Sequence, residues 1–293
     1  MKKLTILLSL KDRHEETEYW ITNNYFSDFE YIIADGSIEN YNYQIFEKLK
    51  KKNINYIRYK PDNKYSDYYT KVYDACLKIK TPYVMQIDND DIINKFGLEI
   101  CLKKIDNNSK IKIINGFTGG FNKLDLKYKI TDFKENNCEH IVRNKPLERI
   151  NSYLRNYRII WYSIFSTDTF QKAWKDCLNI SCENVLHTEI VHGMSALANG
   201  EFYFCDITTY LRRTNPLNSI YRNLKKKNHT IEETDYNRIA EYFNEKYSID
   251  KNSILNHFKM KNYTYKKRKF IFKIFLYFLR KRKINTNEMI NIV

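Results

Sequence analysis

The strongest chemical signal in the sequence is a short acidic segment that follows an apolar run. Residues Tyr83–Ile87 lead directly into Asp88, Asn89, Asp90 and Asp91. Carboxylates this close repel one another unless a cation or an array of donors neutralises them. Oxygen ligands of this kind suit Mg²⁺ or Mn²⁺, and either ion can hold a diphosphate. The alternative is a solvated acidic turn in which Asp90 or Asp91 caps the next helix, and this segment alone favours neither interpretation.

A second carboxylate stands in the same position relative to another apolar run. Asp35 follows Tyr31–Ala34 and is itself followed by Gly36 and Ser37. Ligands of parallel α/β sheets bind at the carboxyl ends of the strands. Asp35 and the segment 88–91 can therefore contribute to one site. The alternative is that Asp35 is an ordinary turn residue beside Gly36.

Alternating strands and helices are needed to position these acids. Strands are expected over residues 4–10, 31–34, 54–59 and 83–87, and helices over 15–24, 43–51 and 67–79. The last helix is indicated by apolar residues at helical spacing, such as Tyr69, Val72 and Cys76. Strands that alternate with helices predict a largely parallel, Rossmann-like sheet covered on both faces. The expected fold class is α/β.

The second half of the sequence is less regular. Strands are expected over 110–115, 159–166 and 202–210, a loop or excursion with small strands over 117–145, and a helix over 188–198. That helix should end at Gly200, which is expected to be its C-cap. After Pro216 the chain becomes polar and helical.

The cysteines and the amino-terminal residues exclude several classes of protein. None of the six cysteines forms a Cys-x-x-Cys pair, so a zinc knuckle or a redox motif is not expected. Buried, reduced thiols in a cytosolic protein are the simplest interpretation. Residues 1–10 resemble a signal peptide, but the charged residues 11–16 follow directly and no cleavage site appears, so a first strand is expected. No apolar run approaches the ~20 residues that span a bilayer.

Most of the positive charge belongs to the last part of the chain. The formal net charge is +15, and residues 251–287 contain twelve Lys or Arg and no acid, which leaves +3 for the rest. Basic clusters at 266–269 and 280–283 flank the apolar run 270–279. As a helix this run would be about 15 Å long, half of a bilayer core. It could lie on an anionic membrane surface. The alternatives are packing on the catalytic domain or on another subunit, and nucleic-acid binding, which is not expected.

The order of the motifs resembles a known family. Residues 4–13, Tyr31–Ser37, Thr81–Val84 and Asp88–Asp91 are similar to the nucleotide-binding half of bacterial family 2-like GT-A glycosyltransferases. The similarity runs over about residues 3–120 and more weakly to about 215. Those enzymes carry an apolar first strand, an Asp-Gly-Ser turn and an Asp-x-Asp motif. Their first strand leads into a Pro-Thr-Tyr-Asn-like turn, which this sequence replaces with Ser9–Arg13.

The resemblance implies roles for individual residues of the first half. Asp35 would contact the base or the ribose of the donor. Asp88 and Asp90 would be the Asp-x-Asp pair that holds the metal at the donor, with Asp90 the more direct ligand. Asp67 and Lys71 lie on the helix before the fourth strand and are further donor-binding candidates, Lys71 through a phosphate. For both residues a solvated helix face is the favoured interpretation.

The second half offers a candidate base. In the resembling family an acid opens a helix on the acceptor side, and Glu189 matches that placement. As a general base, Glu189 would take a proton from the acceptor hydroxyl; the alternative is the ordinary acidity of a helix start. His187 and His192 are five residues apart, unlike the i, i+4 pair of a zinc site. They are expected to be structural or to line the acceptor site.

Three further residues could line the site. Arg212 follows the strand expected over 202–210 and could contact the donor diphosphate, although a surface cation is an equal alternative. Trp161 and Tyr162 could stack on an acceptor sugar, but core packing is the favoured interpretation for both.

These observations predict a GT-A domain over residues 1–215 and a helical, basic C-terminal region over 216–293 that could associate with a membrane. The expected reaction transfers a sugar from a nucleotide sugar, first of all a UDP-sugar, to a glycan or lipid-linked acceptor, with Mn²⁺ or Mg²⁺ as cofactor. The resemblance implies inversion and a place in bacterial surface polysaccharide synthesis. The expected location is cytoplasmic, peripheral on the inner face of the cell membrane.

Two other classes remain open. A nucleotidyltransferase can also use a parallel sheet with metal-holding carboxylates, but it would normally show a Gly-rich loop near the first strand, which residues 8–13 lack. A non-catalytic protein that binds membranes or nucleic acid through the basic tail would leave the ordered acids unexplained.

Overall fold

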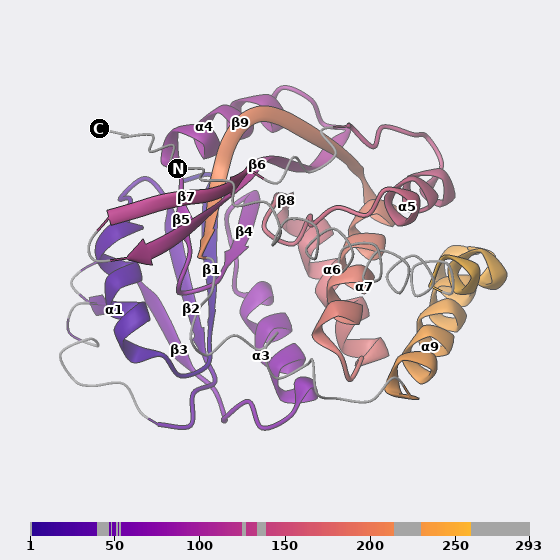
Figure 1. The fold of residues 1–293 in the computed structure, drawn as a ribbon, viewed down its shortest axis with the longest axis horizontal. Coiled ribbons are helices and arrows are strands. Elements are labelled where there is room, and N and C mark those ends of the chain that lie inside the picture. The colour runs from indigo at the N-terminus through magenta and orange to yellow at the C-terminus, as the bar shows by residue number, and fades with distance from the viewer. Residues whose placement is uncertain are drawn as a thin grey trace, which may run out of the picture.

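The computed structural model is a mixed α/β fold built on one sheet (Figure 1). It describes residues 2–39, 47, 49–50, 52, 54–124, 127–133, 139–213 and 230–258. The strands are β1 (Leu4–Leu10), β2 (Glu30–Asp35), β3 (Asn55–Arg58), β4 (Tyr83–Ile87), β5 (Ile92–Ile93), β6 (Ile111–Leu124), β7 (Lys127–Phe133), β8 (Ile164–Ser166) and β9 (Glu201–Arg213). The helices are α1 (His14–Asn23), α3 (Tyr65–Leu77), α4 (Lys95–Asp106), α5 (Pro146–Arg155), α6 (Thr167–Ile180), α7 (Val185–Asn199) and α9 (Thr230–Tyr247). The strand order is β3-β2-β1-β4-β8-β6-β9-β5, with β7 paired to β6.

The first four strands form a parallel unit that contains both acid sites. β1 lies between β2 and β4, and β3 follows β2, so the four expected strands are confirmed. Leu10 pairs with Asp35 and Leu8 with Ile87. Three loops therefore leave the same edge of the sheet: the β1 loop (Lys11–Arg13), the turn after β2, and the acidic loop (Asp88–Asp91).

Helix α3 shows how the local pattern fixes an element. Tyr69, Val72 and Cys76 recur at helical spacing, and all three are buried. This face packs toward β1, β2 and α6. The helices expected over 15–24 and 67–79 are present as α1 and α3, whereas the helix expected over 43–51 lies largely outside the described residues.

The second half of the sheet mixes strand directions. β8 pairs antiparallel with β4 and with β6, while β6 and β9 run parallel. β6 does not end at residue 115: it continues to Leu124, because from Phe117 onward it still pairs with β9. The expected loop or excursion over 117–145 therefore begins too early, since residues 117–124 belong to β6, whereas the small strand expected within it is present as β7. Gly116 permits the close approach, since a Cβ there would meet the Ile207 carbonyl oxygen.

Two other expected elements are corrected. Only Ile164–Ser166 is a strand within the range 159–166, because Ser163 N donates to the Ile160 carbonyl and forms a turn (3.1 Å). α7 ends before Gly200 as expected, but Gly200 has φ −174°, an extended conformation and not a left-handed C-cap. Packing explains why residue 200 is a glycine, because a Cβ there would overlap the Lys112 side chain.

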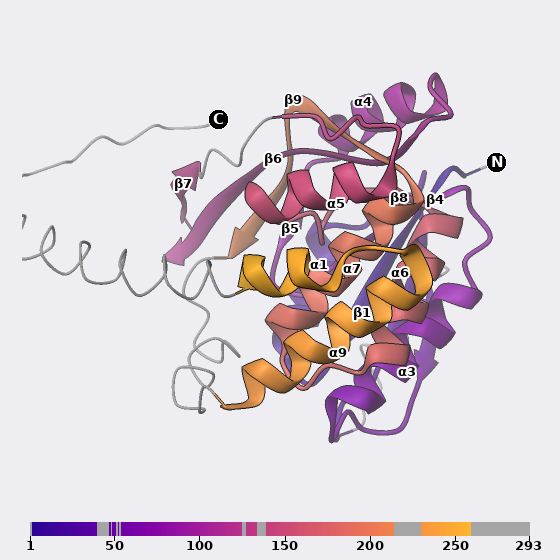
Figure 2. The same cartoon turned by 90° about the vertical axis from the view of Figure 1, so that its right-hand side faces the viewer.

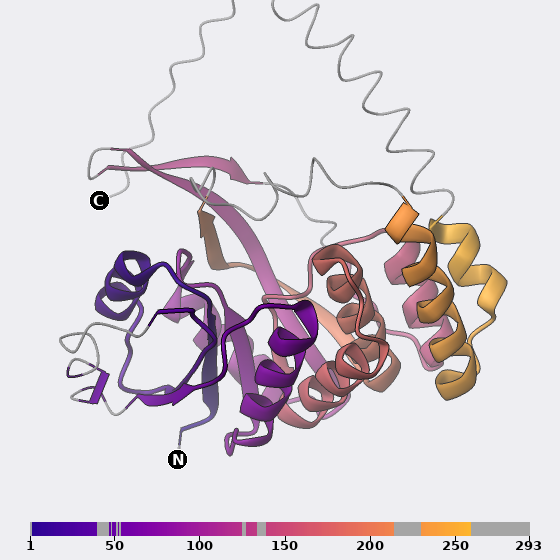
Figure 3. The same cartoon turned by 90° about the horizontal axis from the view of Figure 1, so that it is seen from below.

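The helices form successive layers beside the sheet. Across the molecule the order is α1, the sheet with α3, the pair α6 and α7, and then α9 on the outside (Figure 3). Figure 2 shows α9 lying over α6 and α7, which it contacts, and Ile239, Ala240 and Phe243 of α9 are buried. The expectation of helix after Pro216 is thus confirmed for α9, and residues 251–258 are also helical.

The structure tests the expectation about the cysteines and only part of the expectation about the membrane. Within the described residues, the cysteines at positions 76, 101, 177, 182 and 205 are free and buried. The described part of the chain holds no helix that is both long and apolar enough to cross a bilayer. The apolar run 270–279 and its basic flanks lie outside the described residues, so the membrane-binding role of the tail stays a prediction.

Candidate active site

The β1 loop connects the two predicted parts of the site. Asp12 and Arg13 both have left-handed backbone conformations, with φ values of 58° and 63°. On one side, the Asp12 backbone N–H donates to Ser37 Oγ (2.7 Å) in the turn after β2. On the other side, Arg13 Nη1 donates to Asp90 Oδ2 (2.8 Å). Because β2 and β4 flank β1, the turn after β2 and the acidic loop are about 10 Å apart at the usual strand spacing. Both acid sites lie at one edge of the sheet.

Asp35 is fully buried and its carboxylate is already engaged. Its Oδ1 accepts hydrogen bonds from Ser37 N (2.8 Å) and Ser37 Oγ (2.5 Å). Its Oδ2 accepts from Tyr56 OH (2.5 Å) and Arg58 Nη1 (2.6 Å). Burial, followed by the hydrogen bond to Asp35, raises the pKa of Tyr56. Asp35 therefore fixes the turn after β2, and Arg58, whose side chain is 28% exposed, presents a charge at the surface of this strand end.

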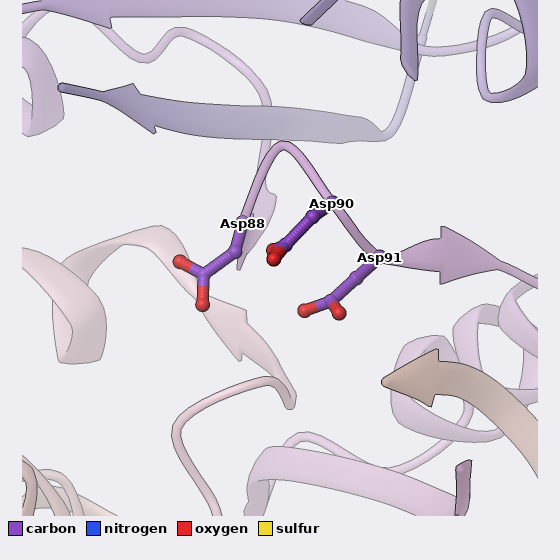
Figure 4. Close-up of side chains that lie close together, drawn as sticks. All are labelled: Asp88, Asp90 and Asp91. Carbon is purple, nitrogen blue, oxygen red and sulfur yellow. The ribbon is translucent and has the colours of Figure 1, made fainter. Parts of the chain in front are cut away.

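The acidic loop brings three carboxylates together. Oxygen atoms of Asp88, Asp90 and Asp91 lie within 4.8 Å of one another, and the side chains project to the same side of the loop (Figure 4). Asp91 is buried and accepts hydrogen bonds from Tyr210 OH and from Arg213 N (2.8 Å) on β9. Asp91 thus anchors the loop to β9. Asp88 and Asp90 are less buried than Asp91, and their role as metal ligands stays a prediction.

The aromatic ring beside Asp88 belongs to Tyr162. Tyr162 OH donates to Asp88 Oδ2 (2.6 Å), and its ring stacks on Tyr210 with centroids 4.6 Å apart. The Arg212 guanidinium lies 5.9 Å from the Tyr162 ring centroid. Arg212 is therefore placed beside the acidic loop. Tyr162 is buried, as core packing predicted, but its hydroxyl also orients a candidate metal ligand.

The charges in the acidic loop are not balanced. Burial and the neighbouring Asp88 raise the pKa of Asp90, while Arg13 opposes this effect. Burial, Asp90 and Asp88 raise the pKa of Asp91 well above the usual carboxyl value. Carboxylates in this state are stabilised by a bound cation, and hard oxygen ligands at this spacing suit Mg²⁺ or Mn²⁺. The residues present fit the expected cofactor.

Lys71 does not lie on a solvated helix face, so the interpretation favoured for it is wrong. Its side chain is 1% exposed, forms an ion pair with Asp62, and donates to the carbonyl oxygen of Leu10 (2.7 Å) at the end of β1. Burial lowers the pKa of Lys71. Asp62 also lies so close to Gly36 that a Cβ there would overlap its carboxylate. The ion pair between Lys71 and Asp62 therefore supports both the β1 loop and the turn after β2.

Asp67 is placed at the start of α3. Its Oδ2 accepts from the Lys64 backbone N–H (3.1 Å), and its Oδ1 pairs with Lys60 Nζ (2.6 Å). The hydrogen bond from Lys60 lowers the pKa of Asp67. These contacts are those of a residue that stabilises the amino-terminal end of a helix.

Glu189 lies near the start of α7, on a different part of the chain. Its Oε1 accepts from Tyr157 OH (2.8 Å), and the residue is half-buried. Two positions earlier, His187 Nδ1 lies 2.7 Å from Asp235 Oδ2 on α9. The structural role expected for His187 therefore has a physical basis, while the catalytic role of Glu189 stays a prediction.

His192 and Trp161 belong to the core. The His192 ring lies 5.0 Å from Trp161, 5.1 Å from Phe165 and 5.5 Å from Trp174 by ring centroids. Burial lowers the pKa of His192 to about 3, so the ring is neutral near pH 7. Core packing, the favoured interpretation for Trp161, is confirmed by its 7% exposure.

Sequence reasoning missed several residues that build the site. Arg13 and Tyr210 contact the acidic loop directly, and Tyr56 and Arg58 hold Asp35. The alternation in β3 could have placed Tyr56 and Arg58 on one face next to β2. For Tyr210 no local signal exists, since it lies 119 positions after its partner Asp91.

Comparison with known proteins identifies the fold. No protein-family model matches the chain, and no curated protein matches it. Among solved structures it is similar to S. aureus TarS 1–349, with a TM-score of 0.58, 16% identity, and coverage of 87% of this chain and 71% of that one. The complex of TarS 1–349 with UDP gives a TM-score of 0.56 at 16% identity, covering 86% and 68% of the two chains.

The longer TarS structure gives a TM-score of 0.56 at 15% identity and covers 86% of this chain but only 41% of that one. The chain thus spans less than half of that protein. The similarity confirms the predicted α/β fold of GT-A type. At this level of identity it establishes the fold alone.

Proposed function

We propose that this protein is a metal-dependent glycosyltransferase that moves a sugar from a nucleotide sugar, a UDP-sugar, to a glycan or lipid-linked acceptor. The observation that carries the proposal is the acidic loop, whose three carboxylates converge beside the β1 loop at the carboxyl edge of the parallel strands. Ligands of α/β sheets bind at this edge. The fold supports the proposal, because TarS is a GT-A-type glycosyltransferase that has been solved in complex with UDP.

The residues of the acidic loop have distinct parts in this proposal. Asp88 and Asp90 would hold Mn²⁺ or Mg²⁺, and Asp91 fixes the loop to β9. When bound, the ion would act as a Lewis acid toward the nucleotide diphosphate leaving group. Tyr162 orients Asp88 through its hydroxyl, and Arg212 lies over the Tyr162 ring, where its charge can meet a diphosphate oxygen.

The ends of β2 and β3, at the same edge of the sheet as the acidic loop, complete the donor site. Asp35 holds Arg58 and the turn after β2, where the base or ribose would lie. Lys71 holds the end of β1 through the Leu10 carbonyl, and Asp67 stabilises the start of α3. We therefore assign both residues to positioning the site and not to direct contact with a phosphate.

The acceptor side is assigned to the start of α7. Glu189 is the proposed general base, oriented by the hydrogen bond from Tyr157. Direct attack assisted by this base would invert the anomeric centre. We further propose residues 1–215 as the catalytic domain, residues 216–293 as a helical, basic region that approaches an anionic membrane surface, and a role in surface polysaccharide synthesis at the cytoplasmic face.

The binding of UDP tests the proposal. UDP affinity is measured by titration calorimetry with Mn²⁺ and with a chelator, in the wild type and in Asp90→Asn. We expect Mn²⁺ to strengthen binding in the wild type, and Asp90→Asn to remove most of that gain, about 10–100-fold in affinity.

Asp168→Asn serves as the control, because Asp168 is 72% exposed on α6. It should bind UDP as the wild type does. UDP binding that is independent of metal and unchanged in Asp90→Asn would contradict the proposed mechanism. A panel of nucleotide sugars, compared by thermal stabilisation, would then identify the donor.

A further inference from the structure

Arg13 is the charged group that faces the acidic loop from the end of β1. Its Nη1 donates to Asp90 Oδ2 (2.8 Å), and the Arg13 and Asp90 side chains are 22% and 8% exposed. The other two acids of the loop accept hydrogen bonds from neutral donors: Asp88 from Tyr162 OH, and Asp91 from Tyr210 OH and a backbone N–H. Asp90, the more direct of the proposed metal ligands, is therefore paired with a full positive charge.

The backbone of Arg13 is fixed, while its side chain extends from it into the site. The Arg13 carbonyl accepts from Asn89 Nδ2 (3.2 Å) and from Thr17 Oγ1 (3.0 Å). The preceding residue, Asp12, is held to Ser37 (2.7 Å). Left-handed backbone at non-glycine residues persists only where the surroundings hold it. A guanidinium on such a fixed backbone can leave Asp90 by changing rotamer, without a rearrangement of the loop.

A guanidinium and a divalent cation cannot share Asp90 without penalty. Like charges a few ångströms apart repel, and partial burial of the pair strengthens the repulsion. Binding of the ion therefore weakens the contact between Arg13 and Asp90. Arg13 also precedes α1, whose amino-terminal end favours an anion. A released guanidinium remains within reach of a diphosphate held at the acidic loop.

We propose that Arg13 is a built-in competitor of the metal ion: it neutralises Asp90 in the metal-free protein, is displaced when the ion binds, and then contacts the donor diphosphate. This inference rests on the proposed function, since it assumes that Asp90 binds the ion. It assigns one residue two opposite effects. Arg13 weakens the affinity for metal alone and strengthens the affinity for the nucleotide in the presence of metal.

The test measures Mn²⁺ binding directly, by the electron paramagnetic resonance signal of free Mn²⁺ in the absence of nucleotide. Arg13→Gln should bind Mn²⁺ about fivefold more tightly than the wild type, which corresponds to the removal of a modest ion pair. With saturating Mn²⁺, the same variant should bind UDP about tenfold more weakly, as for a lost charge-assisted hydrogen bond. Arg155→Gln, an exposed charge at the end of α5, controls for net charge and should change neither affinity.

The two affinities separate this inference from the proposed function. If Mn²⁺ strengthens UDP binding but Arg13→Gln binds Mn²⁺ no more tightly than the wild type, the competition is refuted and the proposed function stands. If neither protein binds Mn²⁺, the metal site and the competition both fail. Arg13→Lys provides a second variant should Arg13→Gln not fold, and it should shift the Mn²⁺ affinity in the same direction, since an ammonium cannot reproduce the guanidinium geometry.

Discussion

The acidic loop at the end of β4 and the buried Asp176 on α6 surround their carboxylates in different ways. Asp176 is fully buried and accepts hydrogen bonds from Ser195 Oγ (2.6 Å), Tyr242 OH (2.8 Å) and Tyr247 OH (2.7 Å), and it pairs with Lys246. A single carboxylate is thus held by four donors from α7 and α9. This arrangement joins three helices and leaves the negative charge well compensated.

The acidic loop has three carboxylates and a comparable number of donors. Arg13 and Tyr162 each serve one acid, and Asp91 receives Tyr210 OH and a backbone N–H. The pKa values of Asp90 and Asp91 are raised, first of all by burial and then by their neighbours. The difference indicates that Asp176 stabilises the fold, whereas the acidic loop keeps an excess of negative charge that a cation can neutralise.

The largest effect on stability is expected at Asp176. Asp176→Ala leaves the buried Ser195 hydroxyl and two partly buried tyrosine hydroxyls without this acceptor, so we expect a loss of about 3 kcal/mol in the free energy of unfolding. Urea unfolding measures this loss. UDP affinity in the presence of Mn²⁺ should not change.

Asp168→Ala is the matched control on the same helix, because that carboxylate is 72% exposed. Its effect on the free energy of unfolding should stay within about 0.5 kcal/mol. A similar effect from both variants would contradict the structural role given to Asp176.

Asp90→Asn should have the opposite sign. The folded-state pKa of Asp90 is raised even with Arg13 beside it, so its ionisation in the folded protein opposes folding. Without metal at neutral pH, the variant should therefore be more stable than the wild type, as measured by urea unfolding in chelator.

The pH dependence of that gain gives a second check. The folded protein binds the Asp90 proton more tightly than the unfolded chain does. The unfavourable contribution is therefore complete above the raised pKa, and it disappears as the pH falls below the ordinary value of 3.8. Urea unfolding of both proteins in chelator should show the gain shrinking on acidification; a gain that grows would refute this sign.

The smallest effects are expected when one hydroxyl is removed from each of the two sites. Tyr242→Phe removes a donor to Asp176 and should lower the free energy of unfolding by roughly 0.5–1 kcal/mol, with Mn²⁺ affinity unchanged. Tyr162→Phe removes the donor to Asp88 and should change Mn²⁺ affinity about two- to threefold. Equal effects of the two variants on Mn²⁺ affinity would remove the distinction between the sites.

Much of the parallel half could be predicted from short-range patterns. The apolar runs that became β1, β2 and β4 each end at a charged loop, and α3 shows its buried face at helical spacing. These features depend on residues within one element, so a single sequence displays them. The second half could not be divided correctly, because the length of β6 depends on its pairing with β9, about 90 positions later in the chain.

The sequence by itself determined that acids follow two strands of a parallel sheet, because apolar periodicity and chain order are local properties. Only the tertiary structure decided which of these acids are already satisfied. Asp35 is held by Tyr56 and Arg58 from β3, and Lys71 is buried against Asp62. Neither contact can be predicted from the sequence around Asp35 or Lys71 alone. The partners of the acidic loop lie 74 to 122 positions away along the chain, and only folding brings them close enough to donate a hydrogen bond or screen a charge.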